Sequence, residues 1–313
     1  MERVLITGAS GLLGSNLVLA LNKCFEIAAT YHQHPLHLNM CETMPMDITQ
    51  AEETQAIIRR IKPRVVIHCA AETRVDYCEE NPQEAFWVNV EGTQNLARAT
   101  VHVGAKLLFI STDSIFDGQK GMYNEMATPN PLNIYARTKL AGEQVVKQNV
   151  VDHLIIRTNI YGWNARPKFS LAEWILDRLD HGQIVPGFAD IYFSPILVND
   201  LAEAIVNMIN AELRGIYHVG ASERCSKLDF AIMLCKVFDR DVALVQLANS
   251  DEAGFKAQRP QDTSLDVEKI TQVLNKPMPG IMDGLWRFRR LPEEDYVSRL
   301  RSGFIQEMRS HHD

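Results

Sequence analysis

The sequence predicts an α/β protein in which a doubly wound parallel sheet is followed by a smaller C-terminal lobe. Short, almost continuously apolar runs alternate with stretches of helical spacing through the first half of the chain. A glycine-rich turn directly follows the first run, and the regular alternation ends after Arg157. Alternating strand and helix signals are typical of a parallel sheet with helices on both faces.

The strands are expected where the apolar runs are short and rich in β-branched residues, because such runs suit strands buried on both faces. A further strand is expected to end near Met46. The clearest runs cover residues 4–7, 27–31, 65–69, 107–110 and 153–157.

Helices are expected between these strands, where apolar residues recur at helical spacing. Thr49 is positioned to cap the second helix, and Pro63 follows its end. The four helices are expected over residues 12–22, 50–61, 82–103 and 132–147.

The second half of the chain is less regular. Helices are expected over 171–179 and 201–209, separated by Pro- and Gly-containing turns. Residues 215–220 have strand character and are expected to return to the sheet. A helix near Lys227, an irregular stretch and a helical tail follow.

These signals predict a first part in which strands and helices alternate regularly and a second part in which they do not. We expect a sheet domain over residues 1–160 and a lobe over 161–313, with about 196–220 returning to the sheet domain. The 313 residues agree with this division, because roughly 150 residues per domain is usual.

Composition excludes several classes of protein. With 46% apolar and 23% charged residues, the chain is neither disordered nor a coiled coil or collagen. Its 32 Lys and Arg against 39 Asp and Glu give a formal charge of −7, which argues against nucleic acid as the main partner.

The cysteines and apolar runs indicate the compartment. Six scattered cysteines without a C-x-x-C pair predict free thiols in a reducing environment. No apolar run approaches the roughly 18 residues of a membrane span, and the start of the chain lacks the apolar core of a signal peptide. We expect a soluble cytoplasmic protein without a membrane partner.

The glycine turn predicts a dinucleotide site and a Rossmann-type sheet. It has the spacing G-x-x-G-x-x-G, follows a strand and opens a helix, as such a site requires. The N-terminus of that helix offers N–H groups and partial positive charge to a pyrophosphate. The expected cofactor contacts in the turn are Gly8, Ser10, Gly11, Leu12, Leu13 and Gly14.

The end of the second strand bears on the choice of cofactor. An NAD site usually places a carboxylate there, whereas this chain has Tyr31 and His32. With neither a carboxylate nor an Arg at this position, NADP is favoured only modestly and NAD stays an alternative. His32, His34 and His37 lack cysteine or carboxylate partners at ligand spacing, so they predict a cofactor-edge loop and no metal.

Other strand ends extend the expected cofactor site, because open α/β sheets bind ligands at the carboxyl ends of their strands. Small residues there allow a flat cofactor to lie against the backbone. The further expected contacts are Asp47, Ile48, Ala70, Ala71 and Asn89.

A tyrosine and a lysine four residues apart predict hydride-transfer chemistry. Tyr135 and Lys139 lie on one face of a helix, where the ammonium is expected to stabilise the phenolate and lower its pKa. Ser111 and Thr112 end the fifth strand at the same sheet edge, so their hydroxyls can bond a substrate oxygen. Tyr135 is then the general acid, and Lys139 holds the nicotinamide ribose. Both residues are also expected to contact the cofactor.

Together these residues resemble the extended short-chain dehydrogenase/reductases, and more narrowly the dTDP-4-dehydrorhamnose reductase family. The resemblance extends from residue 1 to about residue 285 and is most specific between Ser111 and Glu143. The segments that carry it are 110–118, 123–125, 131–143, 259–260 and 263–266.

The resemblance implies both the reaction and the roles of residues. In that family the matching Thr112, Tyr135 and Lys139 are catalytic, NADPH or NADH is the reductant, and the substrate is a 4-keto-6-deoxy sugar on a nucleoside diphosphate. The match also implies that Arg259 contacts the diphosphate, which suits its planar charged fork.

The chain departs from the family pattern on the substrate side. Asn159 stands near the place where the family typically has a tryptophan, and Ser114 replaces the usual tyrosine. An Asn at this place is more like sugar-nucleotide epimerases, where it bonds substrate, so the identity of the sugar stays open. The expected substrate contacts are Thr73, Ser111, Asp113, Asn159 and Arg259.

The same motifs also resemble the regulatory beta subunits of methionine adenosyltransferase, which gives a non-catalytic alternative. Such a protein would act through a partner surface, for which the C-terminal tail is one candidate and an amphipathic helix on its own lobe the simpler interpretation. The aromatic, methionine and arginine residues concerned are Trp286, Phe288, Phe304, Met308, Arg287, Arg289, Arg290, Arg299 and Arg301.

The sequence therefore predicts an NADP(H)-preferring reductase of a nucleotide-linked keto sugar. The alternatives are a nucleotide-sugar epimerase or dehydratase with retained NAD, and a non-catalytic NADP-binding regulatory subunit. A homodimer is the default expectation for the assembly.

Overall fold

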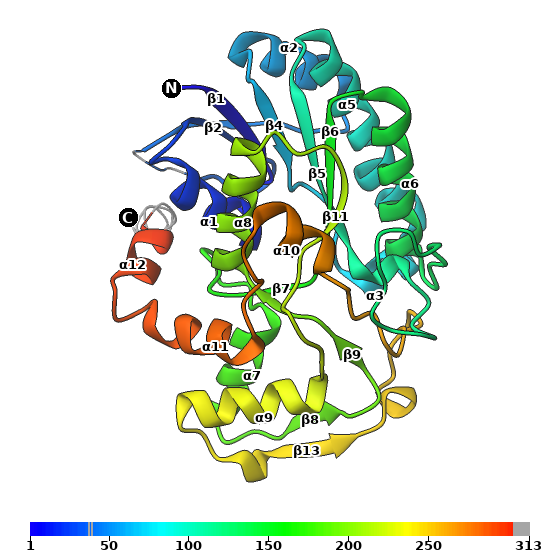
Figure 1. The fold of residues 1–313 in the computed structure, drawn as a ribbon, viewed down its shortest axis with the longest axis vertical. Coiled ribbons are helices and arrows are strands. Elements are labelled where there is room, and N and C mark those ends of the chain that lie inside the picture. Colours follow the sequence, from blue (N-terminus) through cyan, green and yellow to red (C-terminus); the bar gives the residue numbers. More distant parts are fainter. Residues whose placement is uncertain (37, 39, 303–313) are drawn as a thin grey trace, which may run out of the picture.

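The computed structural model describes residues 1–36, 38 and 40–302 (Figure 1). Its centre is a parallel sheet whose seven strands, among these residues, have the order β11-β6-β5-β4-β1-β2-β3. This doubly wound Rossmann order confirms the predicted fold class. The strands are β1 (Arg3–Thr7), β2 (Glu26–Tyr31), β3 (Glu42–Pro45), β4 (Val65–His68), β5 (Lys106–Thr112), β6 (His153–Thr158) and β11 (Gly215–His218).

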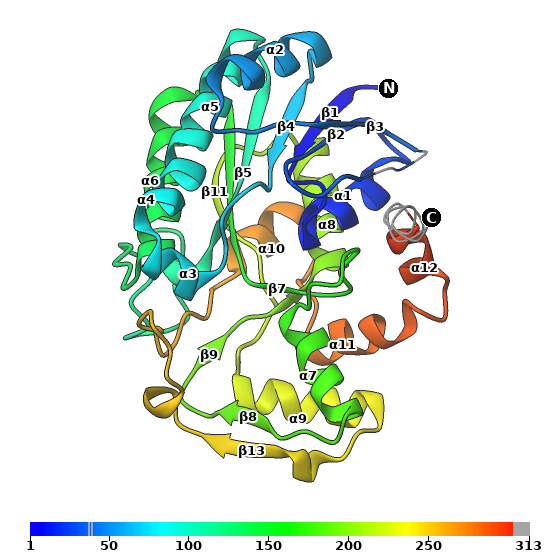
Figure 2. The ribbon, with the colours of Figure 1, turned by 180° about the vertical axis from the view of Figure 1, so that it is seen from behind.

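Helices cover both faces of this sheet because its strands are apolar on both sides. Val4 and Ile6 of β1 belong to the core on one face, whereas Leu5 belongs to the core on the other. The first face carries α1 (Leu12–Leu21), α8 (Val198–Asn210) and α10 (Glu268–Leu274). The second carries α2 (Ala51–Ile61), α5 (Gly92–His102) and α6 (Ile134–Asn149), as Figure 2 shows from behind.

Two helical expectations need correction. Gln50 and not Thr49 occupies the cap position of α2, because the Thr49 hydroxyl donates to Asp47 (2.7 Å) in the preceding turn. The helix expected over 82–103 is divided into α4 (Pro82–Phe86), a π-helical turn η1 (Trp87–Glu91) and α5. A separate helix, α3 (Val75–Glu80), precedes it.

The lobe has a core of its own below the sheet (Figure 1). Phe193, Phe230 and Phe288 are fully buried in it. Its helices are α7 (Leu171–Asp180), α9 (Lys227–Phe238), α11 (Ile281–Arg290) and α12 (Tyr296–Arg301). Its short strands are β7 (Ile160–Tyr161), β8 (Val185–Phe188), β9 (Tyr192–Phe193), β10 (Ile196–Leu197), β12 (Cys225–Ser226) and β13 (Val245–Ala248). Single turns of 3-10 helix occur at η2 (Asp113–Ile115), η3 (Val242–Leu244) and η4 (Ser250–Glu252).

The chain returns to the sheet from the lobe. The pairing of β11 with β6 is parallel and joins Tyr217 to Ile156. The core of the sheet also takes Val267, Ile270 and Met278 from α10 and its flanks, a segment that the sequence analysis leaves with the lobe.

Part of the C-terminal tail considered from sequence as a partner surface packs on the protein itself. Phe288 lies in the core of the lobe, and Arg287 forms ion pairs with Asp200 and Glu203 of α8. Of the aromatic and methionine residues considered, Phe304 and Met308 lie outside the described residues. The described part of this tail therefore packs on its own protein only in part, since Trp286 is 47% exposed, and a partner surface on the tail stays a prediction.

Two further findings concern the compartment and the thiols. All six cysteines are free. Among the described residues, none of the helices combines the length and apolarity that a membrane span needs.

Candidate active site

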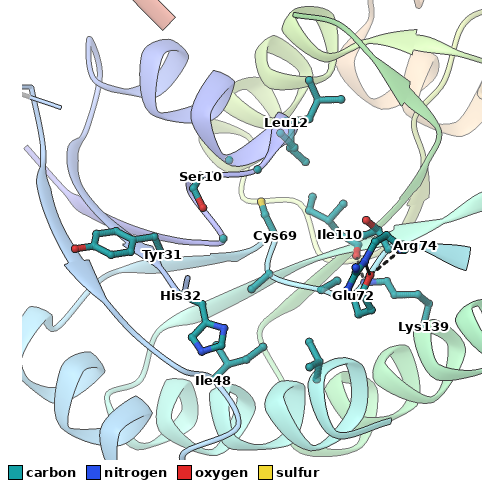
Figure 3. A pocket seen from close by; sticks show the side chains of 18 of the residues that line it. Ser10, Leu12, Tyr31, His32, Ile48, Cys69, Glu72, Arg74, Ile110 and Lys139 are labelled. Atoms are coloured by element: carbon teal, nitrogen blue, oxygen red, sulfur yellow. Dashed lines mark hydrogen bonds and ion pairs between the residues drawn. The ribbon is translucent and has the colours of Figure 1, made fainter. Parts of the chain in front are cut away.

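A cavity of about 1450 Å³ lies at the carboxyl ends of the central strands. Its walls come from the ends of β1 to β5, from α6 and from the segment that leads into α7. Figure 3 shows His32 and Ile48 toward one end and Lys139 toward the other. This is the sheet edge at which a doubly wound fold binds its ligand.

Backbone packing explains two of the glycines in the turn after β1. Gly8 has a φ of 65°, and a Cβ there would lie 2.7 Å from the backbone of Ala70. A Cβ on Gly14 would lie 2.4 Å from the carbonyl oxygen of Gly8. Gly11 is less constrained, since its Cβ would approach only that same oxygen, at 3.2 Å. No side chain caps the start of α1, where Gly11 and Leu12 line the cavity.

The opposite wall at this end is formed by the ends of β2 and β3. The Nε2 atom of His32 lies 3.8 Å from Oδ2 of Asp47. Burial alone would raise the pKa of Asp47, but hydrogen bonds from Thr49 and the charge of His32 bring it below its ordinary value. Tyr31 and Ile48 also line the cavity, as expected.

A buried histidine supports the floor of the cavity. The Thr93 hydroxyl donates to the carbonyl of Asn89 (2.7 Å), so it accepts from Nε2 of His68 (3.1 Å). Nδ1 of His68 is then the acceptor for the Thr7 hydroxyl (2.9 Å), which itself accepts from the N–H of Ala70 (3.2 Å). Burial lowers the pKa of His68 to about 3, so this histidine is neutral.

Asn89 supports the site from outside the cavity and does not line it. Its side chain accepts from the N–H of Glu72 (2.9 Å) and donates to the carbonyl of Glu72 and to the Thr138 hydroxyl (3.0 Å each). These bonds join the π-helical turn to α6 and to the segment that includes Ala71. Asn89 is not among the residues that line the cavity, and its contact with the cofactor stays a prediction.

Thr112, Tyr135 and Lys139 converge at the other end of the cavity. Asn133 caps α6, so Tyr135 lies in its first turn, next to the end of β5. The Thr112 hydroxyl is hydrogen bonded to the Tyr135 phenol. The ammonium of Lys139 donates to the carbonyl of Ile110 (2.7 Å) and lies over the Phe109 ring.

The electrostatics at this end differ from the sequence-based expectation. Burial raises the pKa of Tyr135 well above its ordinary value, and the bond with Thr112 offsets this only in part. Burial also lowers the pKa of Lys139 to about 8. In the protein as described, desolvation outweighs any stabilisation of the phenolate by Lys139, and the phenol is protonated at neutral pH.

Ser111 is held by a buried ionic network that sequence reasoning missed. Its hydroxyl donates to Oε1 of Glu143 (2.6 Å), and Arg157 binds both oxygens of that carboxylate, at 2.9 and 2.8 Å. Arg157 also contacts Nε2 of His218 (3.3 Å), whose Nδ1 donates to the carbonyl of Tyr123. The available signal was the position of Glu143, one helical turn after Lys139.

Asp113 lies behind the cavity wall. Its carboxylate accepts from Asn159 (2.8 Å) and from the Thr263 hydroxyl (2.7 Å). Lys227, which the sequence did not single out, faces Asp113 from the start of α9 and lies over the Phe193 ring. Asn159 lines the cavity, whereas Asp113 does not.

Thr73 and Arg259, the remaining expected substrate contacts, do not lie on the same wall. Thr73 lines the cavity, but Arg259 does not. Nη2 of Arg259 donates to Asp76 of α3 (2.9 Å), whereas its Nη1 is buried without a partner. Beside Thr73, Arg74 forms a bidentate pair with Glu72 (3.0 and 2.7 Å), which sequence reasoning also missed (Figure 3).

The described residues contain no group of His, Cys, Asp or Glu side chains arranged to hold a metal ion. His32, His34 and His37 are expected to form a loop at the edge of the cofactor. His32 and His34 line the cavity, whereas His37 lies outside the described residues.

The Rossmann-type sheet, the glycine turn and the Thr112, Tyr135 and Lys139 group are those of an extended short-chain dehydrogenase/reductase. Within that class, the chain belongs to the RmlD substrate binding domain family, whose model matches residues 1–288. The resemblance stated from sequence is thereby confirmed.

Three similar proteins illustrate the range of names among those that the chain resembles. The probable low-salt glycan biosynthesis reductase Agl14 of Haloferax volcanii is 30% identical over 285 residues, covering 90% of this chain and 95% of the relative. The beta subunit of bovine methionine adenosyltransferase 2 is 31% identical, covering 92% and 88%. The crystal structure of dTDP-4-dehydrorhamnose reductase from Bacillus anthracis in complex with NADP superposes with a TM-score of 0.81 at 32% identity, covering 92% and 98%.

Proposed function

We propose that this protein is an NAD(P)H-dependent reductase of a nucleotide-linked 4-keto-6-deoxy sugar, of the kind that dTDP-4-dehydrorhamnose reductase reduces. One observation carries the proposal. Thr112, Tyr135 and Lys139 lie together at one end of a cavity, and the other end of that cavity is a glycine turn whose backbone a phosphate group can approach closely. Family membership and the reductase names of two similar proteins support it.

The residues that line the cavity are suited to binding a dinucleotide. Gly8 and Gly14 keep the turn free of side-chain atoms where Cβ atoms would collide with backbone. Gly8, Ser10, Gly11, Leu12, Leu13 and Gly14 would hold the pyrophosphate, and Tyr31, His32, Asp47, Ile48, Ala70 and Ala71 the adenosine half. NADP is the proposed cofactor, in line with the NADP of the Bacillus anthracis reductase, and NAD stays an alternative. When bound in its reduced form, the nicotinamide supplies a hydride.

The chain's own residues would supply and steer the proton. Because its pKa is raised, Tyr135 carries its proton at neutral pH and can transfer it to the substrate oxygen as negative charge develops there. The Thr112 hydroxyl positions that oxygen beside the phenol. Lys139 is still mainly charged at neutral pH, and its positive charge stabilises the phenolate that remains.

The residues that would contact the sugar and the diphosphate are also proposals. Thr73, Ser111 and Asn159 line the cavity and can bond the sugar, and the Ser111 hydroxyl also donates to Glu143. Asp113 holds the wall from behind. Arg259 is a proposed diphosphate contact on the family match alone, because it is paired with Asp76 and does not line the cavity.

The test is a panel of nucleotide-linked keto sugars in which loss of NADPH is followed at 340 nm. Tyr135→Phe should lower kcat by at least about 100-fold while the Kd for NADPH changes little, because it removes the proton donor and leaves the other cofactor contacts in place. Tyr77→Phe, the same change at a cavity-lining phenol bonded to Glu84, is the matched control. Unchanged kcat in Tyr135→Phe would overturn the mechanism.

A regulatory role is the second candidate, favoured by the 30–31% identity with methionine adenosyltransferase beta subunits. It predicts dinucleotide binding without consumption of NADPH by any sugar of the panel, and co-elution with the catalytic subunit of a methionine adenosyltransferase. An epimerase or dehydratase, the remaining alternative, would retain NAD through gel filtration.

The assembly and setting of the protein are further proposals. A homodimer in the cytoplasm, with a nucleotide sugar and not nucleic acid as partner, fits the acidic charge and the small-molecule cavity. Light scattering coupled to gel filtration tests the assembly.

A further inference from the structure

The adenosine end of the cavity contains an unusual combination of charges. Lys and Arg line the cavity only at Arg74, Lys139, Arg166 and Lys168 among the described residues, and none of these follows β2 or β3. At the ends of those two strands, the residues that can carry charge are His32, His34 and Asp47. A phosphate at this position would therefore meet histidine as its cation.

His32 and Asp47 form a pair whose net charge depends on a single proton. With Nε2 of His32 and Oδ2 of Asp47 3.8 Å apart, the protonated pair is neutral, and the deprotonated pair carries one negative charge. Asp47 is held by Thr49 through its other oxygen, so it remains in place in both states. The other ionisable groups that face the pair are His34 in the same loop and Glu53 of α2, which accepts from the N–H of Asp47.

The end of β2 is where a doubly wound fold places the ribose of the adenosine. NADP carries a phosphate on that ribose, whereas NAD carries a hydroxyl, which a carboxylate binds well. A neutral His32–Asp47 pair with an N–H donor suits the phosphate. A pair with one negative charge repels the phosphate and leaves Asp47 free to accept from the hydroxyl.

We propose that His32, paired with Asp47, makes the choice between NADP and NAD depend on pH, with NADP preferred at lower pH. This inference rests on the proposed dinucleotide function and specifies how the same site selects its cofactor. It needs no movement of the backbone, because one proton changes the local charge. Histidine is the residue suited to this task near neutral pH.

The test is equilibrium binding of NADPH and NADH, measured by nucleotide fluorescence at pH 6.5 and pH 8.5 without substrate. The ribose phosphate is largely doubly charged at both values, since its second pKa is about 6. The ratio of the Kd for NADH to the Kd for NADPH should fall about tenfold as the pH rises, a coupling of ordinary size for one proton.

Three variants separate His32 from other causes. His32→Gln should give a low ratio that does not vary with pH, and His32→Arg a high ratio that does not vary, because the Arg charge is permanent. His181→Gln, at an exposed histidine after α7, should behave as the unmodified protein.

The outcomes are distinguishable. A ratio independent of pH in the unmodified protein, or one that stays dependent in His32→Gln, overturns the inference and leaves the reductase proposal standing. Failure to bind either dinucleotide overturns both.

Discussion

Gly8 and Gly14 show how single residues shape the cavity. In both cases the obstacle to a side chain is backbone, so no neighbouring rotamer can yield. Gly11 occupies the same motif but has a φ of −84° and only one close neighbour. The three glycines of one motif are therefore unequal, and the difference can be measured.

Gly14→Ala should lower the free energy of unfolding by about 1–3 kcal/mol, since the new methyl group must displace the turn at Gly8. It should also weaken NADPH binding, because the same turn faces the cavity. Urea unfolding and a fluorescence titration measure the two effects. Gly11→Ala is the matched control and should be close to neutral in unfolding; equal losses in the two variants would refute the packing argument.

Helix α6 is the element that joins Tyr135 and Lys139 to the ionic network of Glu143 and Arg157. Tyr135, Lys139 and Glu143 follow each other at intervals of four residues, so they lie along one face of the helix. That face packs against β5 and β6, where Ser111 and Arg157 meet Glu143. One helix thus presents a proton donor, a cation and a buried anion to the end of the sheet.

Glu143→Gln should lower the free energy of unfolding by about 3–5 kcal/mol, because the buried Arg157 loses the carboxylate that compensates its charge. Asp180→Asn, in the exposed pair with Arg240, removes the same kind of charge and should cost less than about 1 kcal/mol. Urea unfolding of both variants at pH 7 checks the difference. Similar losses in the two variants would mean that burial does not determine how much each ion pair contributes to the free energy of unfolding.

At the scale of the whole molecule, two buried histidines link the sheet to its surroundings. His68 joins β4 to β1 and α5, and His218 joins β11 to Arg157 of β6. Burial, together with the charge of a nearby cation (Lys139 or Arg157 respectively), lowers the pKa of each to about 3. Both are therefore neutral in the folded protein at neutral pH.

This depression has a defined consequence for stability. Above pH 6.5, the ordinary histidine pKa, neither state takes up these protons; below it, the unfolded chain does and the folded protein does not. The free energy of unfolding should therefore fall by about 2–3 kcal/mol between pH 7 and pH 5.5. Urea unfolding at both values measures it, and His68→Gln should halve the decrease. A decrease of unchanged size in that variant would contradict the assignment.

The division of the molecule is itself a proposal. We propose a dinucleotide-binding domain over residues 1–160 and a mainly substrate-binding lobe over 161–313, with about 196–220 belonging to the former. The pairing of β11 with β6 and the separate aromatic core of the lobe support it. The burial of Ile270 against the sheet extends the return to α10.

The sequence predicts most of the sheet and the cavity walls, because these depend on local patterns. Apolar strands, a glycine turn at one strand end and the spacing of Tyr135 and Lys139 are visible along the chain. The surroundings of Asn89 and Arg259 were less predictable, because their partners Glu72 and Asp76 lie elsewhere in the sequence. These partners occupy the polar groups that the sequence analysis assigns to cofactor and substrate.

By itself, the sequence determined the fold class, the glycine turn and the positions of Thr112, Tyr135 and Lys139, since each follows from residue type and short-range spacing. Only the tertiary structure decided the protonation of Tyr135 and His68, the bonding of Glu143 and the pairing of His32 with Asp47. These depend on burial and on contacts between segments distant along the chain, and a charge or a proton responds to all its neighbours in space.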